Sequence, residues 1–112
     1  MPDVGGFKSQ IEKIMAYSIL IEPSAQLDIE KAYNYYLEHT KNTIAELFFD
    51  ELQETYSALA INPFYHFRTK TYRAIPLKKF PFLMFFLVNE QNQTVKVLAL
   101  FNTNQDTEKY PK

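Results

Sequence analysis

The sequence predicts an α+β protein with the element order β-α-α-β-β-β, in which a helical hairpin packs on a small antiparallel sheet. Two observations lead to this class. Residues 24–61 repeat their apolar side chains at helical spacing with one break, and after Pro63 the chain changes to short apolar runs that are typical of strands. The chain has 112 residues, 46% of them hydrophobic, which suits one compact core.

The first predicted elements are a strand and a helix. Residues 17–22, "YSILIE", combine β-branched and aromatic residues in rough alternation, and Pro23 ends the strand. Ser24 is the predicted N-cap of the helix, and Asp28 is a favourable charge near its positive end. The apolar positions that follow share helical spacing: Ala25, Ile29, Ala32, Tyr33, Tyr36 and Leu37.

A short break, "HTKNT", precedes a second helix, so the two helices should form an antiparallel hairpin. Thr43 and Glu46 match the pattern of a capping box at its start. The helix should end at Asn62, because a residue before proline avoids the helical region. Its apolar stripe is predicted to face the sheet and consists of Ala45, Phe48, Phe49, Leu52, Tyr56 and Leu59.

Three strands are predicted after Pro63. The first is the half-polar run 66–77, "HFRTKTYRAIPL"; the second is 80–88, "FPFLMFFLV"; and the third is 94–101, "TVKVLALF". The turn "NEQNQ" contains no glycine, so an asparagine should supply the positive φ. The central run is apolar on both faces. One face should meet the helices, and the other is either covered or forms an apolar groove.

The ends of the chain and its location are also predicted. Residues 1–14 form an extension that is either a short docked helix or unstructured, and residues 15–112 form one domain. The chain has no cysteine and no signal-peptide pattern, which predicts a cytoplasmic location. The apolar run 80–88 is far shorter than the roughly 20 residues of a spanning helix, so a membrane anchor is excluded.

The charges are unevenly placed, although the formal net charge is only −1. Residues 22–54 are rich in acids, whereas residues 55–89 contain no acid and carry Arg68, Lys70, Arg73, Lys78 and Lys79. The near-neutral total argues against strong general affinity for nucleic acid. The basic strip suggests a specific anionic partner, or else acidic helices and a basic sheet neutralise each other at the surface.

Several kinds of chemistry are excluded by residues that are missing. No glycine follows Gly6, which removes glycine-rich phosphate loops and dinucleotide fingerprints. The two histidines, His39 and His66, have no metal-ligand spacing, and there is no thiolate. We therefore predict neither a cofactor nor a metal site.

The polar strand holds the candidate functional residues. If it runs without a bulge, His66, Arg68, Lys70 and Tyr72 share one face. Such a face would suit RNA, because the cations hold phosphate, the tyrosine stacks on a base and the histidine moves a proton. The alternative is a solvated strand face with a few cross-strand ion pairs. We take His66 and Arg73 as the catalytic candidates.

The order of these segments resembles the RelE/ParE family, the toxins of bacterial type II toxin–antitoxin modules, also called plasmid stabilisation proteins. The resemblance covers roughly residues 16–110. It rests on "YSILIEPSAQLDI" running into a helix with "AYNYY", on the second helix "AELFFDELQETYSALAINP", and then on "YR", "FPFLMFFLV" and "VKVLALFNTNQD". The family fold, a helical hairpin on a small sheet, agrees with the layers predicted above.

The resemblance implies one of two toxic activities. RelE-like members cut messenger RNA in the ribosome, and ParE-like members poison DNA gyrase without a chemical step of their own. Arg73 occupies the position of the family's strand arginine. Many relatives carry a histidine and then an arginine after the last strand, where this chain has Asn102 and Gln105. Because amides neither ionise nor act as general acids, a ParE-like toxin is the favoured hypothesis.

The alternatives are a RelE-like endoribonuclease and a degenerate toxin fold that only binds antitoxin. In each case the resemblance implies a small acidic antitoxin as partner, which would meet the second face of the central strand and the basic strip beside it. The predicted partner-binding and target-binding residues are Arg68, Lys70, Tyr72, Arg73, Lys78, Lys79, Asn102 and Gln105.

Overall fold

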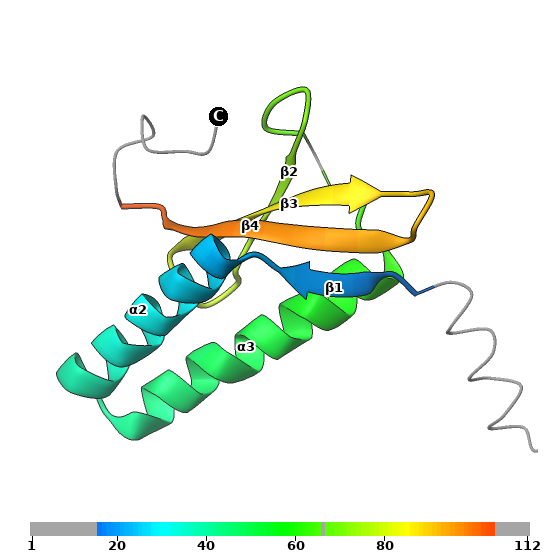
Figure 1. Cartoon of the computed structure of the whole chain (residues 1–112). Coiled ribbons are helices and arrows are strands. Elements are labelled where there is room, and N and C mark those ends of the chain that lie inside the picture. Colours follow the sequence, from blue (N-terminus) through cyan, green and yellow to red (C-terminus); the bar gives the residue numbers. More distant parts are fainter. Residues whose placement is uncertain (1–15, 66, 105–112) are drawn as a thin grey trace, which may run out of the picture.

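The computed structural model describes residues 16–65 and 67–104 (Figure 1). The elements follow the predicted order, with the bounds β1 Ser18–Ile21, α2 Pro23–His39, α3 Asn42–Ile61, β2 Arg73–Pro76, β3 Phe82–Asn89 and β4 Thr94–Asn102. The predicted extension, residues 1–14, lies outside the described residues. In the part that is described, no helix has the length and apolar character needed to cross a membrane.

The α+β class is confirmed, and the four strands form one sheet in the order β1-β4-β3-β2. β2, β3 and β4 pair antiparallel, as predicted, but β1 pairs with β4 in parallel, so the sheet is mixed. After the α2–α3 hairpin, the chain enters the sheet at β2, on the edge opposite β1. The last strand, β4, then lies between β3 and β1. The pattern of a single strand does not indicate the direction of its neighbour.

Both helices lie on the same face of the sheet (Figure 1). The main core lies between these layers, where burial of apolar side chains is the dominant stabilising term. Its buried members are Ala25, Ile29, Ala32, Phe48, Leu52, Leu59, Ile75, Leu77, Phe82, Met84, Phe86, Val95, Val97 and Leu100.

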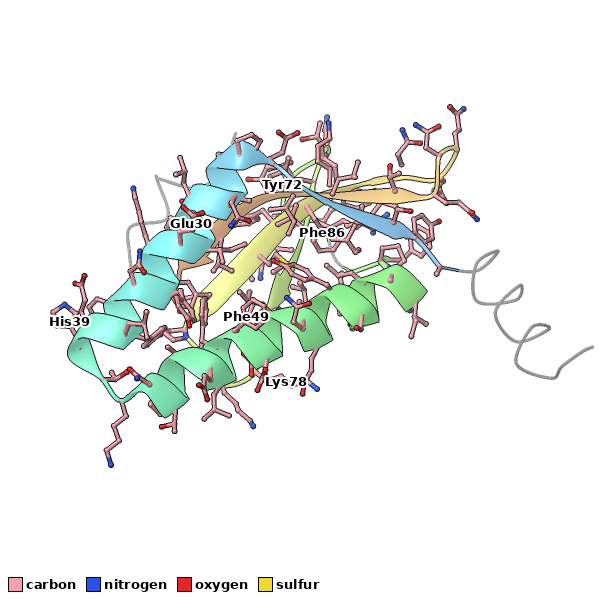
Figure 2. The ribbon with its side chains drawn as sticks, turned by 60° about the horizontal axis from the view of Figure 1, so that its bottom comes forward. Glu30, His39, Phe49, Tyr72, Lys78 and Phe86 are labelled. Carbon is pink, nitrogen blue, oxygen red and sulfur yellow. The ribbon has the colours of Figure 1, made fainter. Side chains whose placement is uncertain are left out.

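The prediction that Phe49 faces the sheet is wrong. Phe48 is fully buried, whereas Phe49 is 50% exposed and lies in a groove between the helices beside Ile29 and Tyr33 (Figure 2). With 3.6 residues per turn, adjacent helix residues point about 100° apart, so only one of the two phenylalanines can face the sheet. Phe48 is in line with the buried Leu52, and this line sets the register.

Neither predicted helix cap forms. α2 begins one residue before Ser24, with Glu22 as its N-cap, and α3 begins one residue before Thr43, with Lys41 as its N-cap; neither N-cap side chain forms a capping hydrogen bond. Pro23 is the first residue of α2, and proline suits that position because its missing N–H would have no helical partner there. The predicted cap residues therefore lie inside the helices.

Ser24 and Asp28 cap the sheet instead. β1 pairs with β4 only as far as Val97, so the next backbone groups of β4 have no neighbour from β1. The Ser24 hydroxyl donates to the carbonyl of Leu98 at 3.0 Å, and the Asp28 carboxylate accepts the N–H of Leu100 at 3.1 Å. Side chains from the first turns of α2 thus satisfy backbone groups at a strand edge.

A bulge in β4 decides which of its side chains face the helices. The register of β3 and β4 shifts between Phe85 and Phe86, which leaves Leu98 as an extra residue in β4. Because the extra residue changes the alternation, Leu100 joins the core under the helices and Phe101 joins the opposite face.

The opposite face of the sheet carries a second apolar cluster. Tyr72 packs edge-on against Phe85 with ring centroids 5.2 Å apart, and Phe85 packs against Phe101 at 6.4 Å. Phe85 is 0% exposed and Leu83 is also buried. This face was predicted to be either covered or an apolar groove. Phe85 and Leu83 are buried, so the face is covered at these residues and they do not form an open groove for a partner.

The turn between β3 and β4 departs from the prediction in one detail. The residue with positive φ is Gln93, at 52°, and not an asparagine. Asn89 acts through its side chain instead, because its Oδ1 accepts the backbone N–H of Asn92 at 3.0 Å.

Candidate functional site

Among the described residues of the predicted strand 66–77, only Arg73–Pro76 is strand, and residues 68–72 form a tight turn. The N–H of Arg68 donates to the carbonyl of Tyr72 at 3.0 Å, and the Thr69 hydroxyl accepts the N–H groups of Thr71 and Tyr72 at 3.1 and 3.3 Å. Threonine hydroxyls that bond to the backbone two or three residues ahead stabilise turns. The sequence contained this signal in "RTKTY", but the strand pattern concealed it.

This turn separates the residues that were predicted to share a face. Arg68 and Lys70 are exposed at the turn, whereas Tyr72 is buried against Phe85 on the face of the sheet away from the helices. The prediction that these three residues share one strand face is therefore wrong. His66 lies outside the described residues.

Arg73 lies at the start of β2 and is held by its own chain. Its guanidinium carbon is 3.9 Å from the ring centroid of Phe67 and 5.4 Å from that of Phe64. Its Nη1 also donates to the carbonyl of Tyr65 at 2.6 Å. Stacking on aromatic faces and a fixed hydrogen bond orient a side chain that would otherwise sample many rotamers.

Three aromatic side chains around this arginine remain open to solvent, which is unusual for large apolar groups so close together. Phe64 is 48% exposed, Tyr65 37% and Phe67 56%. We call Arg73 and these three residues the Arg73 cluster. Two adjoining cavities of about 290 and 160 Å³ open on the cluster, and both are lined by Phe64, Phe67 and Arg73.

Lys78 and Lys79 lie at the other end of β2, in the loop that leads to β3, and Figure 2 shows Lys78 beside α3. Both lysines are exposed. The loop is fixed by Glu51 of α3, whose carboxylate accepts the backbone N–H of Lys79 at 2.9 and 3.2 Å. Glu51 is only 5% exposed, and sequence reasoning treated it as one of many acids on a helix.

The basic strip is not neutralised by the acids of the helices. Among the described residues, the salt bridges are Lys96 with Glu22 at 3.3 Å and a long contact between His39 and Glu38 at 4.0 Å. None of the five cations between residues 68 and 79 forms an ion pair in this part of the chain. The alternative in which the acids of the helices pair with these cations is therefore not seen among the described residues.

Asn102 ends β4 and pairs with Phe82, so it lies at the end of the sheet near Lys78 and away from Arg68. It lines a cavity of about 670 Å³ together with residues of α2 that sequence reasoning missed, including Asp28, Lys31 and Tyr35. Their spacing of three and four residues on one helix was the available signal. Gln105 lies outside the described residues.

Two tyrosines, Tyr36 of α2 and Tyr56 of α3, have a raised side-chain pKa. Burial, with a smaller contribution from the neighbouring Tyr35, raises the pKa of Tyr36 above its ordinary value of 10.0. Burial also raises the pKa of Tyr56 to about 12. Both phenols are therefore neutral at physiological pH, so neither serves as a general base there.

The predicted site residues thus form two groups rather than one. Arg68, Lys70 and Arg73 gather before and at the start of β2, and Lys78, Lys79 and Asn102 gather at the opposite end of the sheet. Across the four residues of β2 this separation is roughly 10 Å. The described residues contain no group of three His, Cys, Asp or Glu side chains able to hold a metal ion.

A helical hairpin on one face of a small mixed sheet defines a small α+β protein, and this one carries exposed cations beyond both ends of β2. A family described as the ParE toxin of the type II toxin–antitoxin system parDE matches residues 19–107. The chain belongs to this family. No curated protein matches the sequence.

Solved structures share the fold at low identity. The chromosomal ParDE system of P. aeruginosa aligns with a TM-score of 0.67 and 16% identity, covering 79% of this chain and 97% of that one. The free E. coli toxin RelE, as an arginine-to-alanine mutant, aligns with a TM-score of 0.58 and 15% identity, covering 84% and 90%. The RelBE2 toxin–antitoxin complex of Mycobacterium tuberculosis gives 0.54 and 12%, covering 79% and 92%.

Proposed function

We propose that this chain is the toxin of a type II toxin–antitoxin module and that it acts in the manner of ParE. In this proposal it binds and inhibits a protein target, DNA gyrase, and a cognate antitoxin neutralises it. Family membership supports the module. The choice of a ParE-like mechanism depends on the chemistry of the candidate residues.

One observation supports that choice: the candidate residues that the structure describes supply binding groups without an acid–base pair. Arg68, Lys70 and Arg73 are cations at neutral pH, and Asn102 does not ionise. The guanidinium of Arg73 donates to the Tyr65 carbonyl and lies over the Phe67 ring, so it supplies a fixed positive charge but no group that removes a proton. A ribonuclease of this type needs a group that removes the proton of the attacking 2′-hydroxyl.

The test compares two activities of the purified protein. We expect inhibition of gyrase supercoiling and accumulation of cleaved DNA, with induction of the DNA-damage response in cells that express the chain. We expect messenger RNA on translating ribosomes to stay intact in primer-extension maps. Discrete cuts in ribosome-bound message that vanish in Arg73→Ala would contradict the proposal and favour a RelE-like endoribonuclease.

An acidic antitoxin is the proposed partner, because the exposed Lys78 and Lys79 form no ion pair in the described part of the chain. The expected source is a short reading frame beside the gene with an acidic C-terminal half. Titration calorimetry against that product should show tight binding. Absence of binding would rule out the module, and binding without growth inhibition would indicate a degenerate toxin fold.

A further inference from the structure

We propose that the Arg73 cluster is a seat for one carboxylate side chain of a protein partner, presented next to an apolar side chain. The inference deepens the proposed function, because it names the chemistry that the protein-binding surface recognises. It rests on the donors of Arg73, on the aromatic walls and on the size and charge of the cavities beside it.

The first step concerns hydrogen-bond donors. A guanidinium has five N–H groups in one plane, and that of Arg73 uses one nitrogen to bond the Tyr65 carbonyl. No other acceptor among the described residues bonds this side chain. The guanidinium lies over the Phe67 ring, and Arg73 also lines both cavities, so its donors other than Nη1 are available to a ligand there. Edge donors in this arrangement match the two oxygens of a carboxylate.

The second step concerns the walls. Phe64, Tyr65 and Phe67 are all at least 37% exposed around the arginine, so a partner that covers them removes apolar area from water. Aromatic residues with an arginine are the composition that protein interfaces favour at their strongest contacts. Covering the rings also lowers the local dielectric, which strengthens a carboxylate–guanidinium pair.

The third step concerns size and charge. The cavities of about 290 and 160 Å³ lie at or below the lower end of the roughly 300–1,000 Å³ typical of small-molecule sites, which suits single side chains. Arg68 and Lys70 lie exposed in the adjoining turn without an ion pair among the described residues, which favours an acidic ligand. Glu90 lines the smaller cavity and would repel any anion there, so the larger cavity, whose described lining contains no acid, is the expected seat of the carboxylate.

The experiment is an NMR titration of the full chain with two blocked dipeptides, acetyl-Leu-Glu-amide and its glutamine counterpart. We expect the glutamate peptide to bind about tenfold tighter, as one charge-assisted pair provides, with shifts at the Arg73 Nε–H and at the rings of Phe64 and Phe67. Arg73→Lys keeps the charge but loses the planar donors, so the preference should fall several-fold.

Lys41→Ala is the matched control, because Lys41 is an exposed cation at the far helical hairpin, and the tenfold preference should persist in it. Equal binding of the two peptides, or a preference that survives Arg73→Lys, would overturn the inference. So would displacement of the glutamate peptide by a short RNA at lower concentration. If the peptide preference holds while gyrase is unaffected, the proposed function fails and the carboxylate seat stands.

Discussion

The carboxylate of Glu51 accepts the backbone N–H of Lys79 with both oxygens, at 2.9 and 3.2 Å, and so joins the middle of α3 to the loop between β2 and β3. Glu51 is 5% exposed, and its own carbonyl accepts the hydroxyl of Thr55 at 2.8 Å. A buried carboxylate without a hydrogen bond would be costly, so this contact holds the loop, and the two lysines it carries, in one position.

We expect Glu51→Ala to lower the free energy of unfolding by about 1–3 kcal/mol, because it leaves the Lys79 N–H without its acceptor. Glu51→Gln keeps one acceptor oxygen and should cost less. Urea denaturation measures both. The exposed Glu54→Ala is the control and should change stability by less than about 0.5 kcal/mol. Equal effects at the two positions would mean that the buried contact contributes nothing.

The register of α3 gives a second prediction. Phe48→Ala should cost about 3–5 kcal/mol, because it opens a cavity in the core, whereas Phe49→Ala should cost about 1 kcal/mol, since half of that side chain is already in water. Chemical denaturation of the two variants under the same conditions gives the comparison. A larger loss at Phe49 than at Phe48 would show that the helix is turned by about 100° from the described position.

The edge of β4 gives a third prediction. Asp28→Ala should destabilise the protein by about 1–3 kcal/mol, because the Leu100 N–H loses its acceptor where β1 no longer reaches. Amide hydrogen exchange should show the Leu100 N–H less protected in this variant. Glu30→Ala, two residues along α2 and exposed, is the control and should leave both stability and exchange nearly unchanged.

The fold was predictable because its main determinants are local and periodic. Helical spacing from residue 24 onward and the apolar run 80–88 were enough to give the element order. The errors lie where the result depends on distant partners. β1 joins β4 in parallel because of the path of the whole chain, and Ser24 and Asp28 bond to β4 rather than capping a helix.

The site was predictable only as a list of residues. Arg68, Lys70 and Tyr72 were expected on one face, but the Thr69 hydroxyl stabilises a turn there, and hydroxyl–backbone bonding competes with strand pairing. The stacking of Arg73 on Phe67 depends on that same turn. No periodic pattern indicates a contact of this kind. The sequence therefore did not show that the candidate residues lie in two groups, one at each end of β2.

The raised pKa of Tyr56 predicts how stability depends on alkaline pH. The folded pKa is about 12 and the unfolded value is 10.0, so between them the folded state keeps a proton that the unfolded state has lost. The stabilising effect is complete below about pH 10 and is lost as pH rises towards about 12. Tyr36 shifts in the same direction, by burial first and then by Tyr35.

We therefore expect the free energy of unfolding to fall by up to about 2 kcal/mol across that range, beyond any general charge effect. Tyr56→Phe should flatten the profile, because the phenol that ionises is gone. Urea denaturation at several alkaline pH values gives the free energies, and tyrosinate absorbance gives the folded pKa. A profile in Tyr56→Phe as steep as in the parent chain would contradict the assignment.

The final prediction concerns how the proposed antitoxin approaches. Lys78 and Lys79 are exposed and form no ion pair among the described residues. The hydrogen bond from the Lys79 N–H to Glu51 holds the loop that carries both lysines in place. Exposed cations at fixed positions mainly affect the rate of encounter with an acidic partner and contribute less to the bonds that hold the complex. Lys78→Glu should therefore slow association roughly two- to fivefold at low salt, with little change in dissociation. Added salt should shrink the difference, because it screens exposed charges.

Surface plasmon resonance against the acidic product of the neighbouring gene gives both rates. Lys41→Glu changes the net charge equally at the helical hairpin, so equal slowing by the two variants would mean that only net charge matters and that the loop does not guide the partner.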